Sequence, residues 1–102
     1  MSYRDAHLSV DFHRRAATLD SAPMILTRKE YELLALLVSY PGVIVPRAEL
    51  LMLVWGYSTQ IRTRTLDVHI RHLRKKLGPY ARRYIETVFG VGHRFQPCGA
   101  AR

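Results

Sequence analysis

The stretch that decides the fold covers residues 65–77 and reads TLDVHIRHLRKKL. At ~100° per residue, its apolar side chains fall within about 60° of one another; they are Leu66, Ile70, Leu73 and Leu77. The opposite side carries cations and one valine, namely Arg64, Val68, Arg71 and Lys75, with His72 beside them. The pattern predicts an amphipathic helix from about Arg62 or Thr63 to Leu77, buried on one side and cationic on the other.

The cationic side of this helix suits a polyanionic partner. The major groove of duplex DNA is about 12 Å wide and admits a helix, and Arg and Lys bind phosphates or reach guanine edges there. Val68 is the one apolar residue among these cations. Contact with a thymine methyl group is one explanation, and the other is that single exposed valines are common and need none. Asp67 lies four residues before Arg71, so we expect an i,i+4 ion pair, or else a surface pair of little energetic weight.

The net charge of +8 is unevenly distributed along the 102 residues. Residues 1–61 carry six basic and six acidic side chains, whereas residues 62–102 carry ten basic and two acidic ones. The whole excess therefore lies in the last part of the chain. This favours a nucleic-acid partner, and a solubilising surface is the plain alternative.

A β-hairpin is expected directly after the basic helix. Residues 84–88 form its first strand, residues 89–92 (FGVG) a tight turn, and residues 93–96 the returning strand. Such a hairpin would lie beside a nucleic-acid groove as a wing, with Arg94 and the glycine-rich turn near the backbone. The Gly90-x-Gly92 spacing follows no strand–helix unit, so it does not indicate a dinucleotide site.

Two more apolar helices are expected before the basic one. Thr27-Arg28-Lys29-Glu30 matches the S/T-x-x-E capping box and predicts a helix over 28–39. After a short extended link at 43–45, Pro46 suits the first turn of a second helix that runs to Trp55. The second helix, a loop at 56–61 and the basic helix give a helix-turn-helix, although this loop is longer than a tight turn.

The N-terminal part is expected to be a small antiparallel sheet. Residues 8–12 alternate apolar and polar, residues 16–20 supply a returning strand, and residues 24–26 a third short one. The length suits one domain. The expected boundaries are a linker at 1–7, the domain at 8–97 and a flexible tail at 98–102.

Several classes of protein are disfavoured. No apolar run approaches the ~20 residues that span a bilayer, and the N-terminus has no stretch of signal-peptide length. The single cysteine, Cys98, fits a reducing cytosol, so we expect a cytoplasmic protein without membrane contact. The histidines include no H-x-x-x-H pattern, His69 and His72 lack an evident third ligand, and no nucleophile–base pair stands out; we therefore expect no metal, no cofactor and no enzyme.

From about Leu8 to Phe95 the chain resembles the effector domains of OmpR/PhoB-type bacterial response regulators. The most specific stretch is residues 65–77, followed by residues 86–95 (ETVFGVGHRF) and the capped helix that ends near Leu37. The resemblance implies an α+β winged helix-turn-helix fold with an N-terminal four-stranded antiparallel sheet, a three-helix core and a C-terminal β-hairpin wing. It also implies that residues 65–77 form the recognition helix.

The resemblance assigns roles to individual residues. Phosphate-contacting positions hold Arg64, His69, Arg71, Arg74 and, at the base of the wing, Thr87. Val68 occupies a position suited to a base methyl group. Departures from the usual pattern are His72 for a base-reading Arg, Phe89 for an Arg that enters the minor groove, Pro46 for a Ser cap and His93 for a Tyr. The full predicted DNA-binding set is Arg62, Arg64, Val68, His69, Arg71, His72, Arg74, Lys75, Thr87, Phe89 and Arg94.

These observations predict sequence-specific binding of double-stranded DNA by the output domain of a two-component transcriptional regulator. The resemblance implies direct repeats bound by a second copy of the chain, and RNA polymerase as a partner of the 56–61 loop. It also implies a receiver domain in front, and no part of this chain resembles one. The chain is therefore either a domain of a longer regulator or a stand-alone protein, and residues 2–7, which look like the end of a linker, favour the first. A small basic RNA-binding protein is the alternative, because Tyr84, Phe89 and Phe95 offer rings for base stacking, although alternation would bury some of them.

Overall fold

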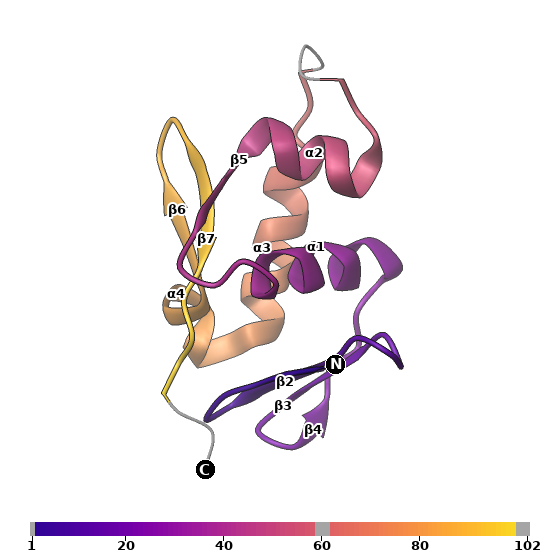
Figure 1. Ribbon diagram of the computed structural model, residues 1–102, viewed down its shortest axis with the longest axis vertical. Helices are drawn as coiled ribbons and strands as arrows, with labels where there is room; N and C mark the ends of the chain where they lie inside the picture. The colour runs from indigo at the N-terminus through magenta and orange to yellow at the C-terminus, as the bar shows by residue number, and fades with distance from the viewer. Residues whose placement is uncertain (1, 59–61, 100–102) are drawn as a thin grey trace.

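The computed structural model describes residues 2–58 and 62–99, and shows an N-terminal sheet, a group of helices packed on it, and a C-terminal sheet beside the helices (Figure 1). The first sheet has the strand order β1 (Ser2–Arg4), β2 (Leu8–Asp11), β3 (Ala16–Leu19), β4 (Ala22–Pro23). The helices are α1 (Arg28–Val38), α2 (Arg47–Trp55), α3 (Thr65–Leu77) and the short α4 (Ala81–Tyr84). The second sheet has the order β5 (Ile44–Pro46), β7 (Gly92–Phe95), β6 (Ile85–Val88).

Helix α1 begins with the capping box that the sequence predicts. The Thr27 hydroxyl accepts a hydrogen bond from the Glu30 amide at 3.2 Å, and the Glu30 carboxylate accepts one from the Thr27 amide at 2.9 Å. These bonds satisfy N–H groups that have no backbone partner in the first turn of a helix. The helix ends at Val38 with Ser39 as its C-cap, close to the expected boundary.

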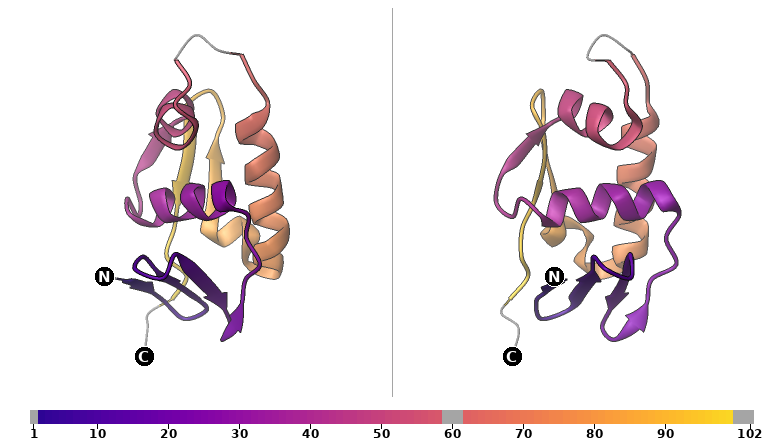
Figure 2. Two further views of the ribbon diagram at one scale, coloured as in Figure 1. Left: turned by 90° about the vertical axis from the view of Figure 1, so that its right-hand side faces the viewer. Right: turned by 45° about the vertical axis from the view of Figure 1, so that its right-hand side comes forward.

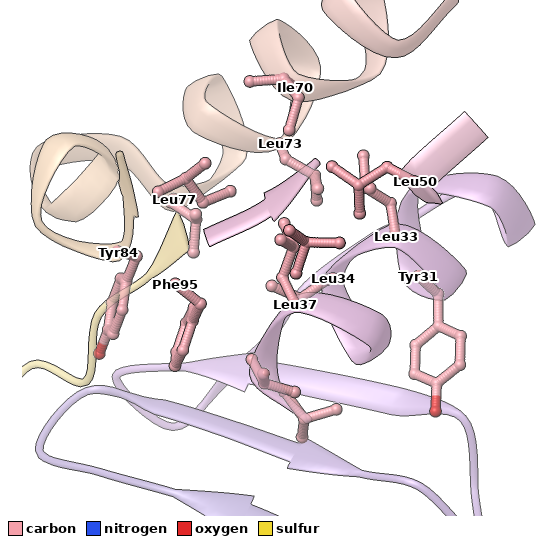
Figure 3. Packing of buried hydrophobic residues seen from close by; sticks show 14 of the residues in the cluster. Tyr31, Leu33, Leu34, Leu37, Leu50, Ile70, Leu73, Leu77, Tyr84 and Phe95 are labelled. Atoms are coloured by element: carbon pink, nitrogen blue, oxygen red, sulfur yellow. The ribbon is translucent and has the colours of Figure 1, made fainter. Parts of the chain in front are cut away.

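The core lies where α1, α2 and α3 meet above the first sheet (Figure 3). The predicted apolar side of α3 is at most 2% exposed: Leu66, Ile70, Leu73, Leu77. It packs among buried leucines of α1 and α2: Leu33, Leu34, Leu37, Leu50. Each large apolar side chain that is fully buried contributes about 1.5–3 kcal/mol, so this packing fixes which side of α3 faces solvent.

Part of the segment 1–7, expected as a linker, belongs to the first sheet. Ser2–Arg4 forms β1, with Tyr3 opposite Val10 on β2, so the four-stranded sheet implied by the resemblance is confirmed. Residues 24–26, expected as a strand, are irregular, and Ala22–Pro23 pairs with β3 instead. Elements this short are below the length at which an alternating pattern can be recognised.

Asp5 links the C-terminal part of the domain to this sheet through hydrogen bonds. Its buried carboxylate accepts hydrogen bonds from two hydroxyls and three amides, those of Tyr3, Tyr84, His7, Leu8 and Cys98. Burial alone would raise the pKa of Asp5, but these hydrogen bonds outweigh it and hold the pKa below its ordinary value. Cys98 is buried as well, so the packed domain extends beyond the expected start of the tail at 98.

The wing is one side of a three-stranded sheet rather than a lone hairpin. Strand β5 pairs with β7, so that Val45 lies opposite His93 and Pro46 opposite Gly92. The sequence indicated only an extended link here and placed Pro46 inside α2, whereas Pro46 ends β5 and is the N-cap of α2. A Cβ atom at Gly92 would lie 2.0 Å from the carbonyl oxygen of Val45, so only glycine fits where the two strands meet.

The segment between α3 and the wing is helical, which the sequence did not indicate. A 3-10 turn, η1 (Gly78–Tyr80), leads into α4, whose last residue, Tyr84, is fully buried. The first wing strand therefore starts at Ile85, one residue later than expected. None of the helices within residues 2–58 and 62–99 is long and apolar enough to cross a membrane.

Candidate nucleic-acid interface

The solvent side of α3 carries the cations that the sequence places there. The exposed side chains opposite the buried ones are Arg64, Arg71, His72 and Lys75, and Val68 among them is half-buried. Asp67 and Lys76, on the flanks of the helix, are exposed as well. Arg62, just before the helix, is also exposed. Figure 2 (left) shows α3 along one edge of the molecule. This side therefore presents several positive charges on one rigid element, as a groove-binding helix requires.

The first turn of α3 is held by Arg47 from α2. The Arg47 guanidinium donates to both carboxylate oxygens of Asp67, at 2.6 and 3.0 Å, and to the carbonyl oxygen of Thr63 at 2.7 Å. The hydrogen bond from Arg47 lowers the pKa of Asp67. The expected pair of Asp67 with Arg71 is thus wrong, because a two-point guanidinium–carboxylate contact from α2 takes its place. Arg71 remains exposed.

Arg47 also contacts the wing through its backbone. Its amide donates to the carbonyl oxygen of Val91 at 3.1 Å, so one residue joins α2, the start of α3 and the wing. Sequence reasoning missed this residue. The signal was present: a cation in the first turn of a helix is unfavourable to the helix dipole, which suggests another role for the side chain.

Arg74 on α3 is hydrogen-bonded to the first strand of the wing, β6. Its guanidinium donates to the Ile85 carbonyl oxygen at 2.9 Å and to the Thr87 hydroxyl at 2.6 Å. Thr87 Oγ1 also lies within hydrogen-bond distance of His93, 3.1 Å from its Nδ1. Burial, helped by the nearby Arg74, lowers the pKa of His93. The buried ring is therefore neutral at neutral pH.

The two histidines of α3 have different surroundings. Nδ1 of His69 donates to the Thr65 carbonyl oxygen at 2.8 Å, and its ring packs edge-on against Trp55, with centroids 4.8 Å apart. His72 is about half-exposed, and its Nδ1 lies 3.5 Å from the buried carboxylate of Glu30. Within the part of the chain that the structure describes, no group of three or more His, Cys, Asp or Glu side chains could hold a metal ion.

The wing carries one paired cation and an uncharged tip. Arg94 on β7 donates to Glu86 on the neighbouring strand β6, at 2.6 and 2.9 Å. The tip exposes Phe89 and Val91, which are 91% and 49% exposed. A groove of about 300 Å³ lies between the tip and the start of α3, lined by residues 87–93, Arg47 and Asp67.

Two further expectations concern the loop and the aromatic residues. In the 56–61 loop, Gly56 caps α2 in a left-handed conformation, and residues 59–61 lie outside the described part of the chain. Tyr84 and Phe95 are fully buried and stack on each other, with ring centroids 5.5 Å apart. Of the three rings considered for RNA stacking, only that of Phe89 is therefore exposed.

The arrangement of sheet, helices and wing has counterparts among known proteins. The model of the family described as "Transcriptional regulatory protein, C terminal" matches residues 21–95. The chain belongs to this family. Curated relatives include the response regulator ArlR of Staphylococcus saprophyticus, 46% identical over 77 residues, and ArlR of Staphylococcus aureus, 41% identical over 87 residues. These matches cover 74% and 84% of this chain but only 35% and 40% of the relatives, so the chain spans well under half of their length.

Solved structures that resemble this domain share its fold over nearly the whole chain. The DNA-binding domain of CpxR from Escherichia coli has a TM-score of 0.85 at 28% identity, covering 99% of each chain. The Klebsiella pneumoniae RstA DNA-binding domain, solved in complex with the RstA box, has a TM-score of 0.84 at 29% identity, covering 95% of this chain and 98% of its own. The OmpR/PhoB homologue DrrB of Thermotoga maritima has a TM-score of 0.83 at 30% identity, covering 93% of this chain and 44% of its own. The winged helix fold and the OmpR/PhoB-type resemblance are confirmed.

In this member of the family, the predicted site residues form two groups. The exposed group is Arg62, Arg64, Arg71, His72, Lys75 and Phe89. The group tied to neighbouring residues by hydrogen bonds or an ion pair is His69, Arg74, Thr87 and Arg94. Val68 is half-buried between the exposed cations. The first group is exposed to a ligand, although His72 also lies 3.5 Å from the Glu30 carboxylate, whereas the second group shapes the surface around it.

Proposed function

We propose that this domain binds double-stranded DNA sequence-specifically, as the output domain of a two-component transcriptional regulator, with α3 in the major groove. One observation carries the proposal: α3 buries its apolar side completely and exposes Arg64, Arg71 and Lys75 on the other side. A rigid helix with this division fits a groove about 12 Å wide and meets phosphates at its borders.

The relatives support the same partner. The RstA domain was solved in complex with the RstA box, and the AdeR DNA-binding domain, which matches with a TM-score of 0.75 at 26% identity, in complex with an intercistronic region. Both cover at least 94% of this chain. The fold shared with these two domains, together with the cationic α3 of this chain, makes duplex DNA the partner that fits this surface best.

The surface suggests a division of labour among the site residues. The exposed cations Arg62, Arg64, Arg71 and Lys75 bind phosphates and set affinity. Base readout is assigned to His72 and Val68, the latter through a thymine methyl group, with help from Arg71. His69, Arg74, Thr87 and Arg94 are hydrogen-bonded within the domain, so we assign them the role of positioning the helix and the wing around the exposed cations.

Selection of bound sequences from a random duplex pool is the direct test. The proposal expects enrichment of a defined motif, and binding to it that weakens steeply as salt increases. A filter competition between that duplex and folded RNA decides between the two nucleic acids. Preference for RNA, or a pool that stays random after selection, would contradict the proposal.

His72 is expected to set sequence preference rather than overall affinity. Its side chain is about half-exposed on α3, so His72→Ala should leave the fold intact. We expect about a fivefold loss of discrimination between the selected motif and single-base variants, and little change on unrelated duplexes. Titrations on both kinds of duplex measure it. Equal losses on every duplex would remove His72 from base readout.

Asp67 is expected to help DNA binding although its charge opposes it. Asp67→Ala removes a negative charge from the interface, which by itself would tighten binding to a polyanion. It also releases Arg47 and with it the start of α3, so we expect affinity to fall about fivefold. Glu49→Ala, which removes one exposed negative charge from α2, is the matched control. Tighter binding by Asp67→Ala would show that the ion pair does not position α3.

Further partners follow from the family resemblance. We propose that a second copy of the chain binds beside the first on direct repeats, that the 56–61 loop meets RNA polymerase, and that the protein is cytoplasmic. Band shifts on duplexes with one or two copies of the selected motif test the first point. Cooperative binding that depends on the spacing between the copies supports pairing, and independent binding contradicts it.

A further inference from the structure

The wing tip offers a contact of a different kind from α3. Residues 88–92 read VFGVG and carry no charged side chain. Phe89 is the most exposed large apolar side chain in the described residues, and Val91 beside it is half-exposed. A partner that covers this ring would remove its apolar area from water, which favours binding.

The tip is braced, so that Phe89 is presented in a fixed place. The turn is closed by a hydrogen bond of 3.0 Å from the Val91 amide to the Val88 carbonyl oxygen, with Gly90 at a φ of 80°. The Val91 carbonyl oxygen accepts from the Arg47 amide, and the base of the wing is bound to Arg74. A rigid hairpin loses little conformational entropy when its tip is buried in a partner.

The position of the tip selects the part of the duplex that it meets. The wing stands beside α3, and its tip lies at the same end of the molecule as the first turn of α3, across the 300 Å³ groove lined by Asp67 (Figures 1 and 2). In B-DNA a minor groove borders each major groove. A helix in the major groove therefore brings an element at its side to the neighbouring minor groove.

We propose that Phe89 is an apolar wedge that enters this minor groove and partly unstacks a base step. The inference rests on the proposed function and adds a determinant of specificity to it. Apolar side chains that enter the minor groove can part neighbouring bases and kink the duplex. Pyrimidine–purine steps such as TA and CA/TG resist this least, so the wedge favours such a step next to the α3 site.

Because the tip carries no charge, its contribution to affinity should depend on salt differently from that of a cation. Cations that bind phosphates release counterions, and their contribution therefore weakens as salt increases. An uncharged ring releases none, and its contribution comes from apolar area removed from water. Loss of Phe89 should therefore lower affinity equally at low and high salt, unlike loss of a cation from α3.

The test compares Phe89→Ala with two other variants on one short duplex selected by the wild-type domain. The duplex carries 2-aminopurine, whose fluorescence rises when bases unstack, at the steps that flank the α3 site. We expect Phe89→Ala to bind roughly tenfold more weakly with an unchanged salt slope, and to lose the fluorescence rise that the wild type gives. Ile25→Ala, which removes another highly exposed apolar side chain far from the wing, should behave as the wild type. Phe89→Arg should steepen the salt slope by about one counterion without the fluorescence rise.

The outcomes separate this inference from the proposed function. If the wild type binds no duplex, both fail. If the wild type binds duplex DNA and Phe89→Ala binds equally well, or if the wild type gives no fluorescence rise at any flanking step, the wedge alone is overturned. Melting curves check folding of the variants, and we expect none to shift, because Phe89 and Ile25 are almost fully exposed.

Discussion

Replacing Arg71 and Lys75 together by Ala is expected to lower the affinity for duplex DNA about a hundredfold at moderate salt. Each side chain is exposed on the middle of α3 and supplies one charge-assisted phosphate contact, worth about tenfold in affinity. The slope of log K against log salt should flatten by about two counterions. Fluorescence anisotropy titrations over a series of salt concentrations measure both quantities.

The control for this double variant removes the same charge elsewhere. Arg14 and Arg28 are both highly exposed, on the β2–β3 turn and at the start of α1. Their joint replacement by Ala should leave affinity nearly unchanged, because the site and not the net charge meets the duplex. Equal effects of the two double variants would contradict the docking of α3. Arg74→Ala is a poorer probe, since it also frees Ile85 and Thr87 on the wing.

Asp5→Ala is expected to lower the free energy of unfolding by about 3 kcal/mol, a large part of the stability of a small domain. The buried carboxylate is the acceptor for the hydroxyl of Tyr84 and for the amides of Leu8 and Cys98. Without it, these donors lose their partner in a place that water reaches poorly. Urea denaturation at neutral pH measures the loss. Asp11→Ala, at an exposed turn where the carboxylate accepts from the amides of His13 and Arg14, should cost much less.

Asp5 also makes stability depend on pH. Its pKa in the folded domain lies below its ordinary value, so its contribution is fully present above the pKa of the unfolded chain, about 3.9. The contribution is lost as the pH falls through the lower pKa of the folded state. We expect the wild type to lose more stability than Asp5→Asn between about pH 5 and pH 2. Parallel pH profiles of the two proteins would contradict this.

The sequence was sufficient for the elements that are long and periodic. The 3.6-residue pattern over 65–77 predicted which side of α3 is buried, and the Thr27–Glu30 capping box predicted the start of α1. It was insufficient for β1, β4 and β5, which have three residues or fewer and exist because partner strands lie beside them. Short strands are stabilised by pairing rather than by any local pattern.

The same limit applied to the candidate site. The exposed cations of α3 followed from helical periodicity, but the partners of Asp67 and Arg74 did not. Arg47 is 20 residues from Asp67 in the chain, and Thr87 is 13 residues from Arg74. A rule based on local spacing selects the pair four residues apart, whereas the folded domain brings a better-aligned guanidinium to the carboxylate.

The contact between Gly92 and the Val45 carbonyl has a practical meaning for engineering. It leaves no room for a side chain at one position of the wing, while Phe89 and Val91 a few residues away point into solvent. Libraries of wing-tip variants can therefore randomise 89 and 91 and must keep 92 constant. The wing thus combines one position where the backbone allows only glycine with two neighbouring positions that can vary without disturbing the packing of the domain.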